Sequence, residues 1–359
     1  MNGALLNYIV KRILLMIPTL LGVLTLTFAV IQFVPGGPVE QMMLELKGRG
    51  EASVGAVESS GAGSQYRGRQ GVDEERLKEI KALYGFDKPP LERYFMMLKR
   101  FAMFDLGQSY YQHKSVWELV VSKLPVSMSL GIWTFLLTYL ISIPLGIKKA
   151  VYAGTRFDTT TSVLVLVGYA IPGFVLGVLL LVLFGGGSFL QLFPLRGLTS
   201  DDWSQLSLIG KVLDYFWHLV MPITASVLSH FAVITMLTKN SFLEEIRKQY
   251  VLTARAKGLS EDKVLWKHVF RNAMIPLVTG FPAAFVGAFF TGSLLIETLF
   301  SLDGLGLLSY ESVMRRDYPV VLGTLYLFTL IGLVTRLVSD IAYVLVDPRI
   351  QLDNRSGGA

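Results

Sequence analysis

The sequence predicts an all-α polytopic membrane protein with six transmembrane helices. Hydrophobic residues make up 52% of the 359 residues, and charged residues only 17%. Several apolar stretches reach the roughly 20 residues that a helix needs to cross a bilayer. The chain has no cysteine, and its four histidines lack the spacing of metal ligands. We therefore expect a multi-pass membrane protein without disulfides or a metal site.

The first expected span, residues 13–34, is longer than the apolar core of a signal peptide. It ends in Val-Pro-Gly-Gly-Pro without a small-residue cleavage site, so we expect it to be retained. The other five spans are predicted by the same hydropathy argument. They lie at residues 126–147, 161–184, 217–237, 275–295 and 320–346.

Positive charge sets the expected orientation. With the N-terminus inside, the short inner segments carry fifteen Lys and Arg, and the short outer segments carry four. Basic residues concentrate on the cytoplasmic side, so the net charge of +6 indicates topology and not nucleic-acid binding. An even number of spans then places both termini in the cytoplasm. The expected divisions are an N-terminal helix at 1–34, a periplasmic segment at 35–125, a five-helix core at 126–346 with a cytoplasmic loop at 239–274, and a cytoplasmic tail at 347–359.

The periplasmic segment changes character along its length. Residues 48–71 are rich in Gly, Ser and Ala without apolar periodicity, which predicts a flexible insertion. Beyond residue 72, apolar side chains recur at helical spacing up to Gly85, which predicts a short amphipathic helix. The segment either packs on the outer face as a hydrated loop or docks a soluble partner. The helical apolar positions are Leu77, Ile80, Leu83 and Tyr84.

The cytoplasmic loop is predicted to fold as a helix, a glycine turn and a second helix. Residues 250–257 favour a helix, Gly258 can end it in the left-handed conformation, and Ser260 can cap the next one. Glu261 and Asp262 favour the positive N-terminal end of that helix. The expected second helix is amphipathic, with Lys263, Lys267 and Arg271 on one face and Val264, Leu265, His268 and Val269 on another. Such a hairpin can simply anchor two spans.

This segment resembles the coupling loop of permease subunits in ATP-binding-cassette importers. Thr-Ala-Arg-Ala-Lys-Gly-Leu-Ser from Thr253, followed by His-x-x-Arg-Asn-Ala-x-x-Pro from His268, is similar to the form in the peptide and nickel branch. The family's Glu-Ala-Ala signature reads Leu-Thr-Ala here, so its glutamate is missing. The resemblance implies a type I importer permease fold whose loop sits in a groove of a partner ATPase. The residues that would couple the two subunits are Tyr250, Thr253, Ala254, Gly258, Glu261, Lys263, Lys267, His268 and Arg271.

Further motifs extend the resemblance over nearly the whole chain. They lie at residues 292–306, 316–319 and 347–350. Ser-Phe-Leu-Glu-Glu-Ile-Arg-Lys-Gln-Tyr, Phe-Pro-Leu-Arg-Gly-Leu and a long insertion at 41–73 make the chain most similar to the Yej-type peptide permeases, which take up microcin C-like peptides. This similarity implies a multi-pass protein of a bacterial inner membrane.

Four residues outside the loop are candidates for the substrate path or for contact with a binding protein. Tyr169 and Pro172 lie in Gly-Tyr-Ala-Ile-Pro-Gly, which breaks the third span and either lines a polar path or kinks a packed helix. Glu297 and Asp303 follow the fifth span, where we expect water-facing carboxylates. They are either ordinary surface groups or contacts for a binding protein or the amino end of a peptide.

One charged pair is expected inside the sixth span. Arg336 and Asp340 lie four residues apart, so they can pair along one helix face, which removes most of the cost of an unpaired charge in hydrocarbon. We expect this pair to reach toward the inner interface. A contact with substrate is the alternative.

The sequence contains no phosphate-binding loop. Gly210-Lys211 is followed by valine and lacks the upstream glycine, so ATP and Mg are expected on a separate ATPase subunit and no cofactor on this chain. The partners implied by the resemblance are a second homologous permease, the ATPase subunits, and a periplasmic or lipid-anchored peptide-binding protein. Peptide substrate and membrane lipid complete the set, and nucleic acid is not expected.

The predicted function is therefore ATP-driven import of short peptides by alternating access, in a subunit with no catalysis of its own. The main alternative is an ion- or proton-coupled secondary transporter. That class needs paired intramembrane carboxylates and internal repeats, whereas only Asp340 lies well inside a span and no repeat is evident. A membrane enzyme would need nucleophile and base residues clustered in the spans, and the sequence shows none.

Overall fold

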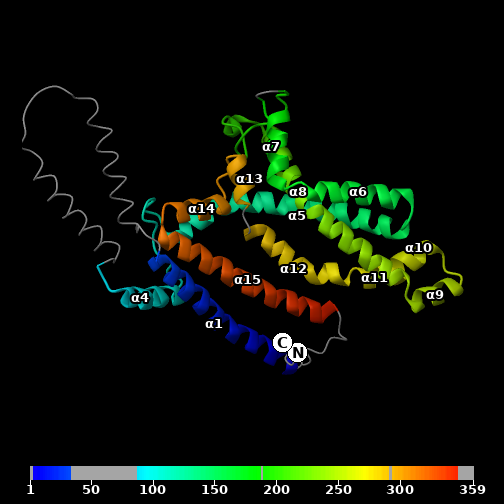
Figure 1. Cartoon of the computed structure of the whole chain (residues 1–359), viewed down its shortest axis with the longest axis horizontal. Helices are drawn as coiled ribbons and strands as arrows, with labels where there is room; N and C mark the ends of the chain where they lie inside the picture. Colours follow the sequence, from blue (N-terminus) through cyan, green and yellow to red (C-terminus); the bar gives the residue numbers. More distant parts are fainter. Residues whose placement is uncertain (1–2, 34–86, 187–188, 291–292, 347–359) are drawn as a thin grey trace, which may run out of the picture. The chain divides into compact units, whose positions relative to one another are not determined.

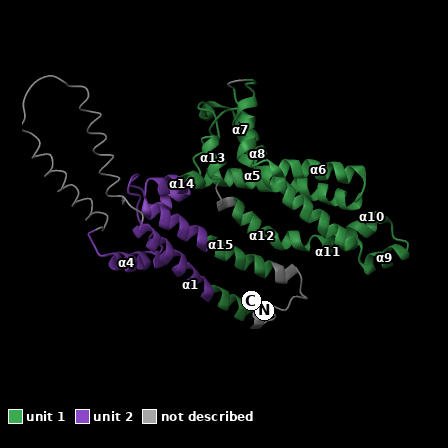
Figure 2. Cartoon of the chain, viewed as in Figure 1, with its two compact units in different colours: residues 1–13, 123–308, 331–359 green, residues 14–122, 309–330 purple. Residues whose placement is uncertain are grey.

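The computed structural model describes residues 3–33, 87–186, 189–290 and 293–346. These residues are mostly helical and contain no extended strand, only two isolated bridges, so the all-α prediction is confirmed for this part of the chain. The described residues fall into two compact units (Figure 2). Unit 1 comprises residues 1–13, 123–308 and 331–359, and unit 2 comprises residues 14–122 and 309–330.

Part of the predicted periplasmic and terminal structure lies outside the described residues. This applies to the insertion at 41–73, the amphipathic helix ending at Gly85 and the tail at 347–359. The structure therefore tests the predictions for the spans and the cytoplasmic loop but not those for the insertion and the tail.

Four described helices are long and apolar enough to cross a membrane (Figure 1). Two further pairs pass the same test as broken helices, so the described residues contain four to six candidate spans. Every predicted span overlaps one of these helices or helix pairs. The four continuous helices are α1 (Gly3–Phe33), α5 (Val116–Val151), α8 (Leu208–Ile246) and α15 (Tyr318–Val346).

The third predicted span is a broken helix, as its sequence indicated. α6 (Arg156–Ala170) and α7 (Gly173–Phe184) meet at an angle of 89°. Ile171 is extended, with φ −86° and ψ 115°, because a residue before proline disfavours the helical conformation. A Cβ on Gly173 would lie 2.4 Å from the Ser229 hydroxyl, so glycine allows α8 to approach the break closely.

The other bent pair joins the cytoplasmic loop to the fifth predicted span. Residues Glu261–Ala273 and Ile275–Ala288 meet at 49°. The predicted span 275–295 runs past the end of α12 (Ile275–Phe290), beyond which a separate helix α13 (Leu294–Leu299) follows. The remaining helices of this region are α9 (Gln249–Ala256), α10 (Glu261–Lys263) and α11 (Phe270–Ala273), with α14 (Leu305–Met314) after α13.

Unit 1 is organised around α8, which contributes to two buried hydrophobic clusters. One lies toward the first half of α8 and includes side chains of α5 and α13. The other lies at the end of α8 and extends into the cytoplasmic loop. Helix α5 also approaches α12 closely, because a Cβ on Gly131 would lie 1.5 Å from the carbonyl oxygen of Ala288. The first cluster contains Leu130, Leu219, Met221, Ile223, Ala225, Ile296, Phe300 and Leu302.

Unit 2 packs α4 (Pro90–Ala102) and the segment that follows it against parts of α1 and α15. Thr25 and Tyr94 share a hydrogen bond of 2.6 Å, and the Phe101 ring packs at a tilt against the Tyr326 ring, with 5.3 Å between the ring centroids. Asp317 accepts hydrogen bonds from the Ser109 hydroxyl and from a backbone N–H. Burial raises the pKa of Asp317, although these donors act in the opposite direction.

The predicted pairing of Arg336 with Asp340 is wrong. Asp340 instead contacts two residues of α1: it accepts a hydrogen bond from the Tyr8 hydroxyl at 2.8 Å and pairs with the Arg12 guanidinium at 3.0 Å. Arg336 is exposed and forms no ion pair with any described residue. Asp340 pairs with α1 and not with Arg336 because α1 offers it two donors. Arg12 donates to the Tyr8 hydroxyl, so the two side chains lie together and both contact the Asp340 carboxylate.

Candidate coupling site

The turn at Gly258 has the predicted conformation. α9 ends at Ala256, and Gly258 has φ +78°, in the left-handed region that favours glycine. Its N–H donates to the Arg255 carbonyl at 2.9 Å. Ser260 occupies the cap position of the next helix, but its side chain makes no capping hydrogen bond with any described residue, contrary to our prediction. The turn is therefore fixed by backbone geometry and not by a side-chain cap.

The second helix of the loop contains a π-helical turn that the sequence did not predict. This turn, η2 (Val264–Val269), lies between α10 and α11. Val264 and Val269 are five residues apart and each is only 1% exposed, because an i to i+5 pattern brings such positions onto one face. Lys263, Lys267 and Arg271 nevertheless all remain exposed.

A buried hydrophobic cluster supports the loop from beneath. Ala254 is 6% exposed within it, so this residue anchors α9 and does not lie on the loop surface. Burying several aliphatic side chains at about 1.5–3 kcal/mol each would tie the two short helices firmly to α5 and α8. The cluster contains Ile147, Ala150, Phe242, Val251, Ala254, Val264, Val269 and Ala273.

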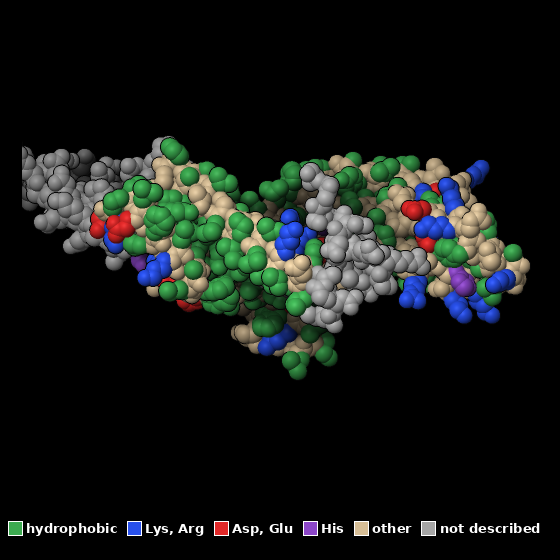
Figure 3. Space-filling model, turned by 90° about the horizontal axis from the view of Figure 1, so that it is seen from below, with side chains coloured by type: hydrophobic (Ala, Val, Ile, Leu, Met, Phe, Trp, Pro, Cys, Tyr) green, Lys and Arg blue, Asp and Glu red, His purple; other side chains and the backbone are tan. Residues whose placement is uncertain are grey.

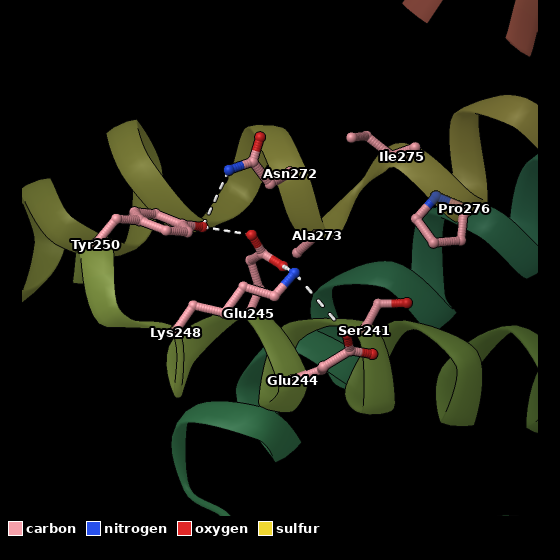
Figure 4. A pocket seen from close by; sticks show the side chains of 9 residues that line it. All are labelled: Ser241, Glu244, Glu245, Lys248, Tyr250, Asn272, Ala273, Ile275 and Pro276. Carbon is pink, nitrogen blue, oxygen red and sulfur yellow. Dashed lines mark hydrogen bonds and ion pairs between the residues drawn. The ribbon is translucent and has the colours of Figure 1, made fainter. Parts of the chain in front are cut away.

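Tyr250 links the end of α8 to the second half of the loop (Figure 4). Its hydroxyl lies 2.5 Å from the Glu245 Oε1 and 3.3 Å from the His268 carbonyl, both of which can accept its proton, and it accepts a hydrogen bond from Asn272 at 3.0 Å. Lys248 pairs with the second oxygen of Glu245 at 2.6 Å. Burial and the hydrogen bond to Glu245 raise the pKa of Tyr250 to about 12, so the hydroxyl keeps its proton at physiological pH.

Glu245, Lys248, Tyr250 and Asn272 line a pocket of about 590 Å³ between α8 and α11. The pKa of Lys248 is raised, chiefly by its hydrogen bond to Glu245, so the ion pair is stable around neutrality. We did not predict Glu245, Lys248 and Asn272 as partners of Tyr250 from the sequence. The run of charged residues before Tyr250 was the only sequence feature that pointed to these partners. The contacts themselves form only because the chain turns between α8 and α9.

The surface of the loop combines positive charge with two projecting apolar side chains. Leu252 and Trp266 are 48% and 57% exposed. Arg255 bonds both oxygens of Glu261 across the Gly258 turn, with a shortest distance of 2.9 Å. Figure 3 shows Lys, Arg and His side chains gathered where α9 to α11 lie in Figure 1. The exposed predicted residues are Thr253, Gly258, Glu261, Lys263, Lys267 and Arg271.

The structure thus separates the predicted coupling residues into two groups. Tyr250 and Ala254 lie in the support beneath the loop, and His268 is partly buried and contributes its carbonyl to Tyr250. The remaining six lie on the surface. This arrangement can act as a rigid projection that presents a basic and partly apolar face to another protein.

The candidates outside the loop occupy different settings. Tyr169 and Pro172 are exposed at the α6–α7 break. We predicted that Glu297 faces water, and this prediction is wrong. The residue is 0% exposed, and its carboxylate accepts hydrogen bonds from the Ser127 hydroxyl at 3.0 Å and from the Leu307 N–H at 2.8 Å. Burial raises the pKa of Glu297, against the effect of these donors. Asp303 is exposed and pairs with Lys123.

The described residues contain no group of three or more His, Cys, Asp or Glu side chains that could hold a metal ion.

Residues 142–352 match the family described as the binding-protein-dependent transport system inner membrane component. The chain is 54% identical over 359 residues to the peptidoglycan transport system permease protein YejB of Agrobacterium fabrum, covering 97% of this chain and 99% of the relative. It is 53% identical over 361 residues to the inner membrane ABC transporter permease protein YejB of Escherichia coli O157:H7, with the same coverage. The dipeptide transport system permease protein DppB of Escherichia coli K12 is 33% identical over 363 residues, again at 97% and 99% coverage. The chain thus belongs to the binding-protein-dependent transport system inner membrane components and is an ABC transporter permease of the inner membrane.

Proposed function

We propose that this permease is the membrane-spanning subunit of an ATP-driven importer of short peptides. A second homologous permease, ABC ATPase subunits and a periplasmic or lipid-anchored binding protein complete the transporter. ATP and Mg bind to the ATPase, and this chain conducts the substrate without catalysing a reaction. The observation that carries the proposal is the loop from α9 to α11, whose exposed basic face rests on a fully buried apolar support.

The proposed topology has six spans with both termini in the cytoplasm. It counts the α6–α7 pair and the pair ending in α12 as one span each, beside the four continuous helices. The concentration of Lys and Arg around the loop at 239–274 supports a cytoplasmic position for this loop. The divisions proposed from the sequence, with a periplasmic segment at 35–125 and a core at 126–346, follow from this topology.

The proposed substrates are peptides of a few residues. Relatives that align over nearly the whole chain are named for peptidoglycan transport and for dipeptide transport, and both names support a peptidic ligand. Peptides released from peptidoglycan and microcin C-like peptide-nucleotides are specific candidates within this class. The alternative of a proton-coupled transporter is weakened, because Asp340 pairs with Arg12 and accepts a hydrogen bond from Tyr8 and so is not paired with a second carboxylate in the way that such a transporter needs.

The proposed mechanism is alternating access driven through the loop. Closure of two ATPase subunits would move the surface around Gly258 and Trp266. The loop would transmit this movement as a rigid body, because Tyr250 and the buried cluster fix both of its helices to α8. The spans would then rearrange around a central path, which includes the region of Tyr169 and Pro172 in this proposal.

Reconstitution of the whole transporter into liposomes tests this function. We expect uptake of short peptides, measured by mass spectrometry, to require the binding protein and ATP on the ATPase side. Uptake that continues without ATP and follows an imposed proton gradient would instead support the secondary transporter. Accumulation of peptide by liposomes that contain this chain alone would also contradict the proposal.

A further inference from the structure

A buried ion cluster joins three helices of unit 1 close to the coupling loop. Asp158, at the start of α6, pairs with Lys239 of α8 through both carboxylate oxygens, at 2.6 and 2.8 Å. Lys149, near the end of α5, lies 3.2 Å from the same carboxylate. In the sequence the two lysines read as ordinary markers of the cytoplasmic side, but here both side chains point into the protein.

The two lysines differ in how far they depend on Asp158. Lys149 is 0% exposed and also donates to the Asp158 carbonyl at 3.0 Å, to Thr161 at 2.8 Å and to Ser162 at 2.7 Å. Among the described residues, Lys239 donates to the two carboxylate oxygens of Asp158 and to no other acceptor. Lys149 therefore fixes α6 to α5, whereas the Lys239–Asp158 pair connects α6 to α8 at this end.

The position of this pair matters because α8 leads directly into the coupling loop. Lys239 lies seven residues before the end of α8 at Ile246, and α8 is continuous over 39 residues. α6 runs from Asp158 to the 89° break that begins α7. At the other end of α6, a Cβ on Gly168 would lie 3.0 Å from the Leu228 side chain of α8, so α6 also approaches α8 closely near the break.

We propose that the Lys239–Asp158 pair is the link by which α8 carries movement of the coupling loop to the broken span α6–α7. This inference rests on the proposed function, and both residues are positioning residues because neither needs to touch the substrate. Without the pair, α6 would still approach α8 near the break, but the start of α6 would be held to α5 alone, through Lys149, and would no longer follow α8. ATP hydrolysis would then continue with little peptide transported.

The test variant is Lys239→Met in the fully assembled transporter. The change leaves Lys149 and Asp158 as a balanced pair, so it removes the link without stranding a buried charge. Lys148→Met is the matched control, because Lys148 is an exposed lysine next to Lys149 that lies over the Phe157 ring and does not pair with Asp158. Lys239→Arg is the conservative variant, since a guanidinium can still bond both carboxylate oxygens.

The measurement is the number of peptides imported per ATP hydrolysed, with a mixture of peptides of about two to ten residues as the probe. We expect Lys239→Met to retain ATP hydrolysis within about twofold while this ratio falls about tenfold. Lys148→Met should leave the ratio unchanged, and Lys239→Arg should restore most of it. If Lys239→Met does not accumulate in the membrane, Lys239→Gln replaces it with the same expected direction.

Three results would overturn the inference. An unchanged ratio in Lys239→Met with normal wild-type uptake would show that the pair does not couple, and would leave the proposed function intact. Failure of both the Met and Gln variants to accumulate would show that the pair serves folding. A wild-type transporter that hydrolyses ATP but imports no peptide would overturn the proposed function and this inference together.

Discussion

Two buried carboxylates in unit 1 are held in opposite ways. Glu245, beneath the coupling loop, lies against the Lys248 ammonium and the Tyr250 hydroxyl and borders an open pocket. Glu297, in α13, is bound by a serine hydroxyl and backbone N–H groups, all of them neutral donors. A charge with an ionic partner and several hydrogen bonds tolerates the loss of one contact. A carboxylate that holds a loop only through neutral donors is more sensitive, because removing it leaves each of those buried donors without an acceptor.

The largest expected effect on stability follows from removing the Glu297 side chain. Glu297→Ala leaves a cavity and strands the Ser127 hydroxyl and the Leu307 N–H, so we expect a loss of about 3 kcal/mol in the free energy of unfolding. Thermal unfolding of the purified protein in detergent measures this loss. Asp303→Ala is the control, with an expected loss below about 1 kcal/mol for an exposed ion pair. Equal losses in the two variants would contradict the role assigned to Glu297.

Because the pKa of Glu297 is raised, its contribution to the free energy of unfolding depends on pH. The folded protein holds this proton more tightly than the unfolded chain, so the stabilising contribution is present below the unfolded pKa and is lost as pH rises through the folded pKa. Glu297→Gln cannot ionise and should lose this part of the pH dependence between the ordinary glutamate pKa and the raised one. Unfolding curves of both proteins over this pH range test the prediction. Parallel pH dependence of the two would show that Glu297 does not titrate as we infer.

A smaller effect is expected beneath the coupling loop. Tyr250→Phe removes one hydroxyl, but Glu245 keeps its contact with Lys248, so we expect a loss of about 1–1.5 kcal/mol in stability. Loss of the hydrogen bonds through which Tyr250 joins α8 to α11 should nevertheless lower peptide uptake more than it lowers the amount of protein in the membrane. Measuring uptake per unit of membrane-inserted chain separates the two effects. A loss of stability larger than that of Glu297→Ala would reverse the comparison.

The sequence predicted the features that depend on local chemistry. Hydropathy located all the candidate spans among the described residues, Pro172 located the break of the third span, and Gly258 located the left-handed turn. The π-helical turn escaped prediction because one extra residue in a turn leaves an almost unchanged pattern of apolar residues. The backbone of Val264–Val269 reveals it, and the burial of these two valines, five residues apart, agrees with it.

Contacts between distant residues could not be predicted in the same way. Asp340 has a possible partner four residues away, yet it pairs with Arg12 at the other end of the sequence. Glu297 looked like a surface group because it follows an apolar span, and its burial depends on the path of the chain from α13 to α14. Each of these outcomes is decided by tertiary packing, for which a single sequence carries no local signal.

The most direct test of the coupling assignment is Gly258→Val. A Cβ at this position would meet no atom within 4 Å, so the cost comes from the left-handed φ of +78° alone. That cost is on the order of 1 kcal/mol, which is too small to unfold the protein but enough to redirect the helix after the turn. Gly258→Ala should be milder. Gly107→Ala, at a φ of +83° in unit 2, is the control for backbone strain away from the loop.

The measurement is co-purification of the ATPase subunits with each variant, together with peptide uptake. We expect Gly258→Val to reach the membrane at a near-normal level while it retains less ATPase and its peptide uptake falls sharply. Gly107→Ala should keep both. Normal ATPase retention and normal uptake in Gly258→Val would contradict the coupling assignment, and loss of the protein from the membrane would show that the glycine is required for folding instead.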